Sequence, residues 1–306
     1  MQKKAFTVLC ADGHQMPVYS WLPVGETACV LHIAHGMSEY AERYGPIAEL
    51  LALQGIAVYA HDQRAHGKAV VKIEEQGLGE HNWFYKQVDD IHIMMQYLKV
   101  TYSHQKIFLL GHSMGSFLCQ RYFQLYGNEI DGLILSASNG KKDPLMSFGI
   151  ALTWLQMKLY GSKYKSNLID KLLFGKYNSY FKPIRTKADW LSRDTKVVDA
   201  YINDPQCGFT CSSLFIYYFF KGISDDFNKK NTSGIPTNIP VYVFSGDKDP
   251  VGLFGKGVLQ LISNWKAAGV KDISYKLYPG GRHEMLNEIN RAEVLDDLVN
   301  WINNHC

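Results

Sequence analysis

The stretch Ile107-Phe108-Leu109-Leu110-Gly111-His112-Ser113-Met114-Gly115 decides the fold of this chain. Its four leading apolar residues predict a buried strand, and the apolar pattern over 117–126 predicts a helix directly after it. The serine has a glycine two positions away on each side, which a tight strand-to-helix turn needs because the neighbouring backbone comes close. Ser113 would then lie at a helix N-terminus, where backbone N–H groups favour developing negative charge. This context predicts a nucleophile in preference to a structural turn serine.

Apolar runs alternate with helical patterns on both sides of this turn. We expect strands at 29–34, 56–60, 107–110, 132–136, 241–245 and 273–278. We expect helices at 44–53, 88–100, 114–126, 257–268 and 292–303. Ahead of these, the runs 5–10 and 17–22 flank Asp12-Gly13 and predict a hairpin. The alternation predicts an α/β protein with a mostly parallel sheet and helices on both faces.

The alternation fails between residues 139 and 235. This segment holds 15 Lys and Arg, eight Asp and no Glu, a net charge of +7 in a chain whose total is +3. The shift predicts a core of residues 1–139 and 236–306 and a helical insertion at 140–235. The first expected helix of the insertion carries apolar residues three and four positions apart, namely Phe148, Ala151, Leu152, Leu155 and Leu159. We expect this face to pack on the core and part of it to line a lipid-sized pocket.

Composition excludes several classes of protein. The chain has 306 residues, of which 46% are hydrophobic and 20% charged, as in ordinary globular domains. A net charge of +3 is too mild to predict a nucleic-acid partner, and no apolar run approaches the length of a membrane span. No export signal is recognised, so we expect a cytoplasmic protein with reduced thiols. Cys207 and Cys211 lack the partners of a zinc site, and neither metal nor organic cofactor is expected.

A serine nucleophile needs a base, and the base needs an orienting acid. Only two histidines follow Ser113, and His305 is the penultimate residue, so His283 in the loop after the last expected strand is the predicted base. The acid should follow the preceding strand, where Asp247 and Asp249 both lie. We favour Asp249 because Pro250 stiffens the turn after it, whereas Asp247 is better placed to close the turn.

The oxyanion of a tetrahedral intermediate needs two aimed donors. The backbone N–H of Met114, directly after the nucleophile, is one candidate. The other is the backbone N–H of Met37, in the loop after the strand at 29–34. His35 precedes the serine in the chain, so we expect it to shape this loop and not to act as the base.

Several of these motifs together resemble those of the α/β-hydrolases of the monoglyceride lipase, lysophospholipase and serine-aminopeptidase-like group. The motifs that carry the resemblance are His35-Gly36-Met37-Ser38-Glu39 with Arg43-Tyr44, His61-Asp62-Gln63-Arg64-Ala65-His66-Gly67, Gly111 to Ser116, Gly246 to Asp249, and Gly281 to Glu284. The resemblance covers about residues 5–139 and 236–304. It implies the triad Ser113, Asp249 and His283, and it implies that the insertion is a helical cap over the site. Ala65 departs from the glycine usual in relatives, which we interpret as a loop adjustment.

The expected reaction is hydrolysis of a carboxylic ester through an acyl-enzyme, with a small acyl ester or lipid as substrate. Aromatic and aliphatic residues of the insertion could form an acyl tunnel, and we assign substrate contacts to Phe148, Leu152, Leu155 and Tyr217. This favours monoacylglycerol or lysophospholipid with a medium or long chain. The basic insertion further predicts transient contact with a membrane surface. A short-chain carboxylesterase or thioesterase remains the alternative, followed by a non-catalytic binding protein, and the sequence leaves the oligomeric state open.

Overall fold

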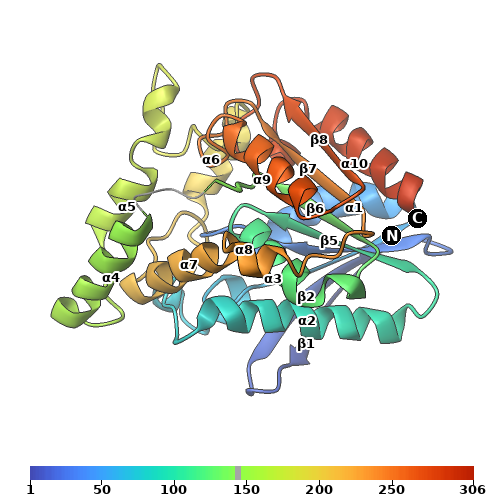
Figure 1. Ribbon diagram of the computed structural model, residues 1–306, viewed down its shortest axis with the longest axis horizontal. Helices are drawn as coiled ribbons and strands as arrows, with labels where there is room; N and C mark the ends of the chain where they lie inside the picture. Colours follow the sequence, from blue (N-terminus) through green and yellow to red (C-terminus); the bar gives the residue numbers. More distant parts are fainter. Residues whose placement is uncertain (142–145) are drawn as a thin grey trace.

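A single eight-stranded sheet organises the computed structural model, which describes residues 1–141 and 146–306 (Figure 1). The strands are β1 (Gln2–Leu9), β2 (Gln15–Leu22), β3 (Cys29–Ala34), β4 (Ile56–His61), β5 (Lys106–His112), β6 (Gly132–Ser136), β7 (Val241–Gly246) and β8 (Ile273–Tyr278). Their order across the sheet is β1-β2-β4-β3-β5-β6-β7-β8. The β1–β2 hairpin is antiparallel, β2 joins β4 antiparallel, and every other pairing is parallel. The predicted α/β class is confirmed.

Helices cover both faces of the sheet (Figure 1). They are α1 (Gly45–Leu53), α2 (Trp83–Thr101), α3 (Met114–Tyr126), α9 (Lys256–Ala267) and α10 (Arg291–His305). Apolar residues of α2, α3 and α9 share one buried cluster, and those of α1 and α10 share the other. In β5, Ile107 and Leu109 belong to the first cluster and Phe108 and Leu110 to the second, since side chains alternate across a strand. Burial on both faces explains why the central strands are continuous apolar runs.

Five α-helices and one short 3-10 helix, Tyr177–Tyr180, occupy the described part of the segment between β6 and β7. The α-helices are α4 (Met146–Tyr160), α5 (Asn167–Phe174), α6 (Thr195–Asn203), α7 (Ser213–Asp226) and α8 (Lys229–Thr232). The helix α7 packs against α2 and α3, and its Phe215 stacks on Trp83 with ring centroids 3.8 Å apart. The segment is therefore tied to the core through α7, while α4 and α5 lie farther out (Figure 1).

The prediction for the apolar face of α4 is wrong in part. Leu155 and Leu159 are 47% and 64% exposed, so they do not pack on the core. The side of α4 that meets α7 instead carries smaller and polar residues, including Gly149, Thr153 and Gln156. Apolar spacing alone did not distinguish these two sides, because a helix carrying apolar residues on more than one side has no single inward face.

Three further observations bear on the expectations from sequence. Within residues 1–141 and 146–306, no helix is long and apolar enough to cross a bilayer. The same residues contain no group of three or more His, Cys, Asp or Glu side chains arranged to hold a metal ion. Lys142 and Asp143, which contribute to the charge of the insertion, lie outside the described residues.

Candidate active site

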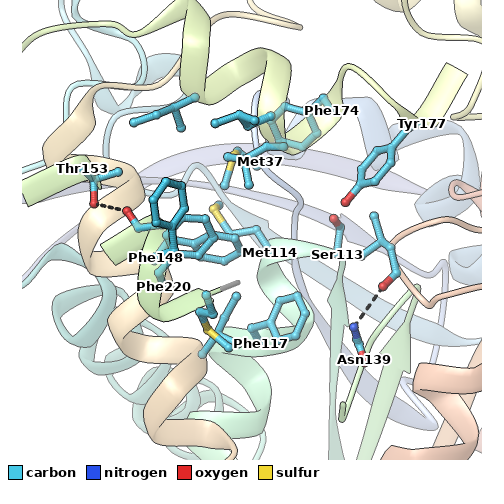
Figure 2. Close-up of a pocket in the computed structure, with 18 of the residues that line it drawn as sticks. Met37, Ser113, Met114, Phe117, Asn139, Phe148, Thr153, Phe174, Tyr177 and Phe220 are labelled. Atoms are coloured by element: carbon cyan, nitrogen blue, oxygen red, sulfur yellow. Dashed lines mark hydrogen bonds between the residues drawn. The ribbon is translucent and has the colours of Figure 1, made fainter. Parts of the chain in front are cut away.

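Ser113 occupies the tight turn between β5 and α3. Its backbone has φ 51° and ψ −117°, a conformation that residues other than glycine rarely adopt. The turn is held close to β3, because a Cβ added at Gly115 would lie 2.1 Å from the carbonyl oxygen of Ala34. The hydroxyl of Ser113 faces a cavity, and Figure 2 shows the Tyr177 hydroxyl pointing toward it. The strained turn thus presents the hydroxyl to a ligand space and not to the core.

Asp249, and not Asp247, is the carboxylate that meets His283. The Nδ1 of His283 lies 2.9 Å from Oδ1 of Asp249, and both side chains are buried. Asp249 also accepts hydrogen bonds from the Val251 amide (2.9 Å) and from the Ser245 hydroxyl (3.0 Å). A carboxylate can only accept, so Nδ1 carries the proton and Nε2 is left as the basic nitrogen. Asp247 instead accepts the Gly280 amide at 2.8 Å, which closes the loop before His283.

The charges around this pair favour an ionised acid and a readily protonated base. Burial raises the pKa of Asp249, but the charge and hydrogen bond of His283 outweigh it and leave the pKa below its usual value. Burial lowers the pKa of His283, but the charge and hydrogen bond of Asp249, with smaller contributions from Glu284 and Glu39, raise it overall. The neighbouring His112 stays neutral, because burial lowers its pKa to about 4. The arrangement is suited to general-base catalysis.

The loop after β3 leaves one amide free to face the ligand space. Within the described contacts, the Gly36 amide donates to Glu39 (2.6 Å) and the Ser38 amide to Nε2 of His66 (3.2 Å). The Met37 amide has no acceptor among these contacts, and Met37 lines the cavities beside Ser113. His35 is buried within this loop, its ring bonded to the Gly36 carbonyl and the Gln63 amide. Its position agrees with a loop-shaping role.

Met114 supplies the second amide of the arrangement. It is the first residue of α3, so its N–H has no partner four residues earlier within the helix. The positive end of the helix dipole adds to the local field. The amides of Met37 and Met114 therefore flank the space next to Ser113 where an oxyanion would form.

A buried ion-pair cluster lies behind this space. Arg43 bonds both oxygens of Glu284, at 3.1 and 2.9 Å, and Oε2 of Glu39 at 2.5 Å. Glu39 in turn accepts the hydroxyl of Tyr44 at 3.0 Å. Because Glu39 holds the Gly36 amide and Glu284 directly follows His283, Arg43 links the oxyanion loop to the loop of the base. This cluster was not predicted from sequence, where Glu39, Arg43 and Glu284 served only as marks of resemblance.

Two cavities meet at Ser113. The larger, of about 510 Å³, is mostly apolar and extends under α4, α5 and α7 (Figure 2). Its apolar lining residues include Met146, Phe148, Leu152, Ile169, Leu172, Leu173, Phe174, Phe219, Phe220, Ile223 and Phe227. The smaller, of about 230 Å³, is bordered by His283, Glu39, Glu284, Asp170 and Lys187. Ser113 and Met37 border both, so the nucleophile stands between a mostly apolar space and a second one whose lining mixes charged and aromatic residues.

The predicted substrate contacts are only half present in this cavity. Phe148 and Leu152 line it. Leu155 does not, because it lies on the exposed side of α4. Tyr217 does not either: its ring lies under the Lys221 ammonium, and α7 lines the cavity with Phe219, Phe220 and Ile223 instead. The sequence predicted a helical insertion and its first helix, but not how α4 and α7 are rotated about their own axes.

The profile of the family described as Serine aminopeptidase, S33, matches residues 25–290. A monoacylglycerol lipase of Mycolicibacterium smegmatis is 28% identical over 287 residues, covering 93% of this chain and 91% of that one. A thermostable carboxyl esterase from Bacillus coagulans, solved with glycerol, superposes with a TM-score of 0.90 at 26% identity over 99% of both chains. A monoglyceride lipase variant from Saccharomyces cerevisiae superposes with a TM-score of 0.77 at 20% identity over 100% of this chain and 97% of that one, a similarity of fold.

Proposed function

The chain belongs to the serine aminopeptidase S33 family and is an ester hydrolase, and we propose that it is a monoacylglycerol lipase that acts through Ser113. The observation that carries this proposal is the position of Ser113 between a mostly apolar cavity of about 510 Å³ and a more polar one of about 230 Å³ that charged residues border. The first suits a medium or long acyl chain, and the second suits a small polar alcohol such as glycerol.

In the proposed reaction the Ser113 Oγ attacks the ester carbonyl carbon while His283 Nε2 takes the hydroxyl proton. The resulting oxyanion accepts hydrogen bonds from the amides of Met37 and Met114. Collapse of the intermediate breaks the bond to the alcohol oxygen, which receives the proton from His283. Water then attacks the acyl-enzyme through the same groups and releases the fatty acid. Asp249 holds the imidazole in the tautomer required and stabilises its cation.

The experiment that tests this proposal compares wild type with Ser113→Ala on p-nitrophenyl esters from acetate to palmitate and on monoacylglycerols. We expect kcat/KM to rise toward C8–C16 in the wild type and turnover to be lost in the variant. A maximum at C2–C4 would still support Ser113 as the nucleophile, but it would show that the substrate is a short-chain ester and not a lipid. Faster turnover of lysophospholipids or thioesters than of monoacylglycerols would show that the leaving group is another alcohol, or a thiol, and not glycerol. Unchanged turnover by Ser113→Ala would refute the mechanism.

A cavity variant tests the acyl assignment separately. Leu152 lines the apolar cavity from α4, so Leu152→Trp should fill part of the acyl space and shift the preferred chain length downward. Leu155 lies one turn away on the exposed side of the same helix, and Leu155→Trp should leave the profile unchanged. Equal profiles for both variants would contradict the assignment.

We further propose that the outer surface of α4 and α5 contacts an anionic lipid surface. On α4, Trp154 is 50% exposed and Leu155 and Leu159 are exposed as well, and on α5 Leu168 is exposed. The exposed lysines among them are Lys158, Lys163, Lys171 and Lys176, and Lys158 lies over the Trp154 ring. Exposed apolar side chains on helices that also carry exposed lysines match a lipid interface, where each basic residue near an anionic surface contributes about 1 kcal/mol.

Cosedimentation with vesicles tests this contact. We expect binding to phosphatidylglycerol-containing vesicles that weakens with salt, and weaker binding after Leu159→Ser. Leu53→Ser is the matched control, because Leu53 is 72% exposed on α1, away from α4 and α5. Equal binding by both variants, or no binding at low salt, would refute the contact without affecting the ester hydrolase assignment.

A further inference from the structure

The inserted segment reaches back to the predicted base through Trp190. This residue lies between the short helix at Tyr177–Tyr180 and α6, far from His283 in sequence. Its indole ring lies against the His283 imidazole, with ring centroids 4.8 Å apart and planes inclined by 42°. Trp190 also borders the smaller cavity together with His283. The ring that faces the base therefore comes from the insertion and not from the core.

The contact is fixed by the backbone on both sides. The His283 amide donates to the Trp190 carbonyl at 3.4 Å, and the Glu284 amide donates to the Leu191 carbonyl at 2.7 Å. The Trp190 amide is itself held by the Asn178 side chain at 3.0 Å. These bonds set the segment at 190–191 alongside the loop of the base, so the position of the indole relative to the imidazole is determined by the fold.

Two further aromatic rings of the insertion pack against the indole. Phe174 is stacked with it at 6.1 Å between ring centroids, and Tyr177 meets it edge-on at 5.0 Å. Both of these residues line the larger cavity. The indole is thus packed against two further aromatic rings besides the imidazole, which restricts the rotamers open to it.

We propose that Trp190 is a positioning residue for His283, whose indole fixes the imidazole and stabilises its protonated form in the transition state. This inference rests on the proposed function, in which His283 becomes a cation each time it accepts a proton. An aromatic face within about 6 Å of a cation attracts it, and tryptophan does so most strongly. The attraction is small for the neutral ring, so it acts in the transition state more than in the free enzyme.

The other groups that face His283 would be unchanged in a Trp190 variant. Asp249 bonds it, Glu284 and Glu39 contribute negative charge, and Arg43 neutralises these two glutamates. His112 lies 4.9 Å away between ring centroids and is neutral over the working pH range. Asp170 and Lys187 border the same cavity. Loss of the indole also exposes His283 to water, which by itself would raise the pKa of the imidazole, because burial lowers it. A fall in the pKa of His283 in the variant is therefore attributable to the lost aromatic face.

The test compares wild type, Trp190→Phe and Trp190→Leu. For Trp190→Leu we expect kcat/KM on p-nitrophenyl octanoate to fall roughly threefold to tenfold, with the acid limb of its pH profile moving to lower pH by about half to one unit. Trp190→Phe keeps an aromatic face, so it should retain most of the wild-type kcat/KM and most of the wild-type position of the acid limb. Phe209→Leu truncates another aromatic wall of the same cavity and should not move the limb.

Two readouts separate this role from a purely structural or substrate-binding one. The rate of deacylation, measured after an acylation burst, involves no leaving alcohol and should fall as much as kcat/KM if Trp190 acts through His283. An NMR titration of the His283 imidazole in wild type and Trp190→Leu should show the pKa lowered in the variant. This titration needs no turnover, so it shows whether the indole stabilises the protonated imidazole even if the proposed function is wrong. Equal pKa values with deacylation rates within about twofold would overturn the proposal.

Discussion

Replacement of Arg43 by leucine would leave two buried carboxylates without their cation. Glu39 and Glu284 are nearly inaccessible to solvent, and Arg43 makes a two-pronged contact with Glu284 and a single contact with Glu39. Burial raises the pKa of Glu284, but the charge and hydrogen bonds of Arg43 outweigh it and lower the pKa from 4.5 to about 2. A difference of this size corresponds to about 3 kcal/mol of stability at neutral pH.

We therefore expect Arg43→Leu to lower the free energy of unfolding by about 3–5 kcal/mol, the range found when one partner of a buried pair is removed. The assay is equilibrium urea denaturation at pH 7, followed by tryptophan fluorescence. Arg43→Leu with Glu284→Gln should recover part of the loss, because one uncompensated charge is then removed. A loss below about 1 kcal/mol would refute the reasoning.

The pH dependence of the same variant gives an independent check. Without Arg43, burial should raise the folded-state pKa of Glu284 above its unfolded value. In the variant, the contribution of Glu284 to stability is then present below the pKa that this group has in the unfolded state. It is lost as pH rises through the higher pKa of the folded state. The variant should therefore lie closer to wild type at pH 5 than at pH 8. Glu39 also holds the Gly36 amide, so kcat should fall with stability, and Arg43→Lys should restore stability only in part.

Three further outcomes follow from other parts of the fold. Gly115→Ala should destabilise the protein by about 1–3 kcal/mol in a thermal melt, because the new Cβ would overlap the end of β3. Gly234→Ala is the control, since its Cβ would meet nothing closer than 3.5 Å and stability should change little. His32 and His61 are fully buried, and burial lowers the pKa of both, that of His32 to about 3. The stability that these neutral histidines contribute is complete above about pH 6.5 and should be lost as pH drops toward 3. A melting temperature that is constant from pH 7 to 5 would contradict this. Asp226 is buried, its carboxylate has no hydrogen-bond partner among residues 1–141 and 146–306, and burial raises its pKa. Asp226→Asn should therefore raise the melting temperature more at pH 8 than at pH 5, and a smaller gain at pH 8 would be the contrary result.

Much of the core was predictable because its signals are local. Each expected core strand and helix is present, with ends within a few residues, since buried parallel strands are short apolar runs between helical patterns. The turn around Ser113 was predictable because only glycines allow its close approach to β3. The choice of Asp249 over Asp247 followed from chain order and a stiff turn, and the structure places Asp249 against His283.

The cavity walls were less predictable because they depend on how helices are rotated. In α4, Leu152 and Leu155 have the same apolar character, yet one lines the cavity and the other faces solvent. In α7, Tyr217 does not line the cavity, whereas Phe219 and Phe220 do. A helix with apolar residues on several sides does not specify which side faces inward, so packing against its neighbours decides it.

The sequence by itself determined the order of strands and helices, the nucleophile turn and the candidates for acid and base, because each depends on residues adjacent in the chain. Only the tertiary structure decided that Arg43 joins the loops of Gly36 and Glu284, and that Trp190 lies against His283. These contacts join residues that are far apart in sequence. No local pattern encodes such a distance, since it is set by the packing of the whole chain around the sheet.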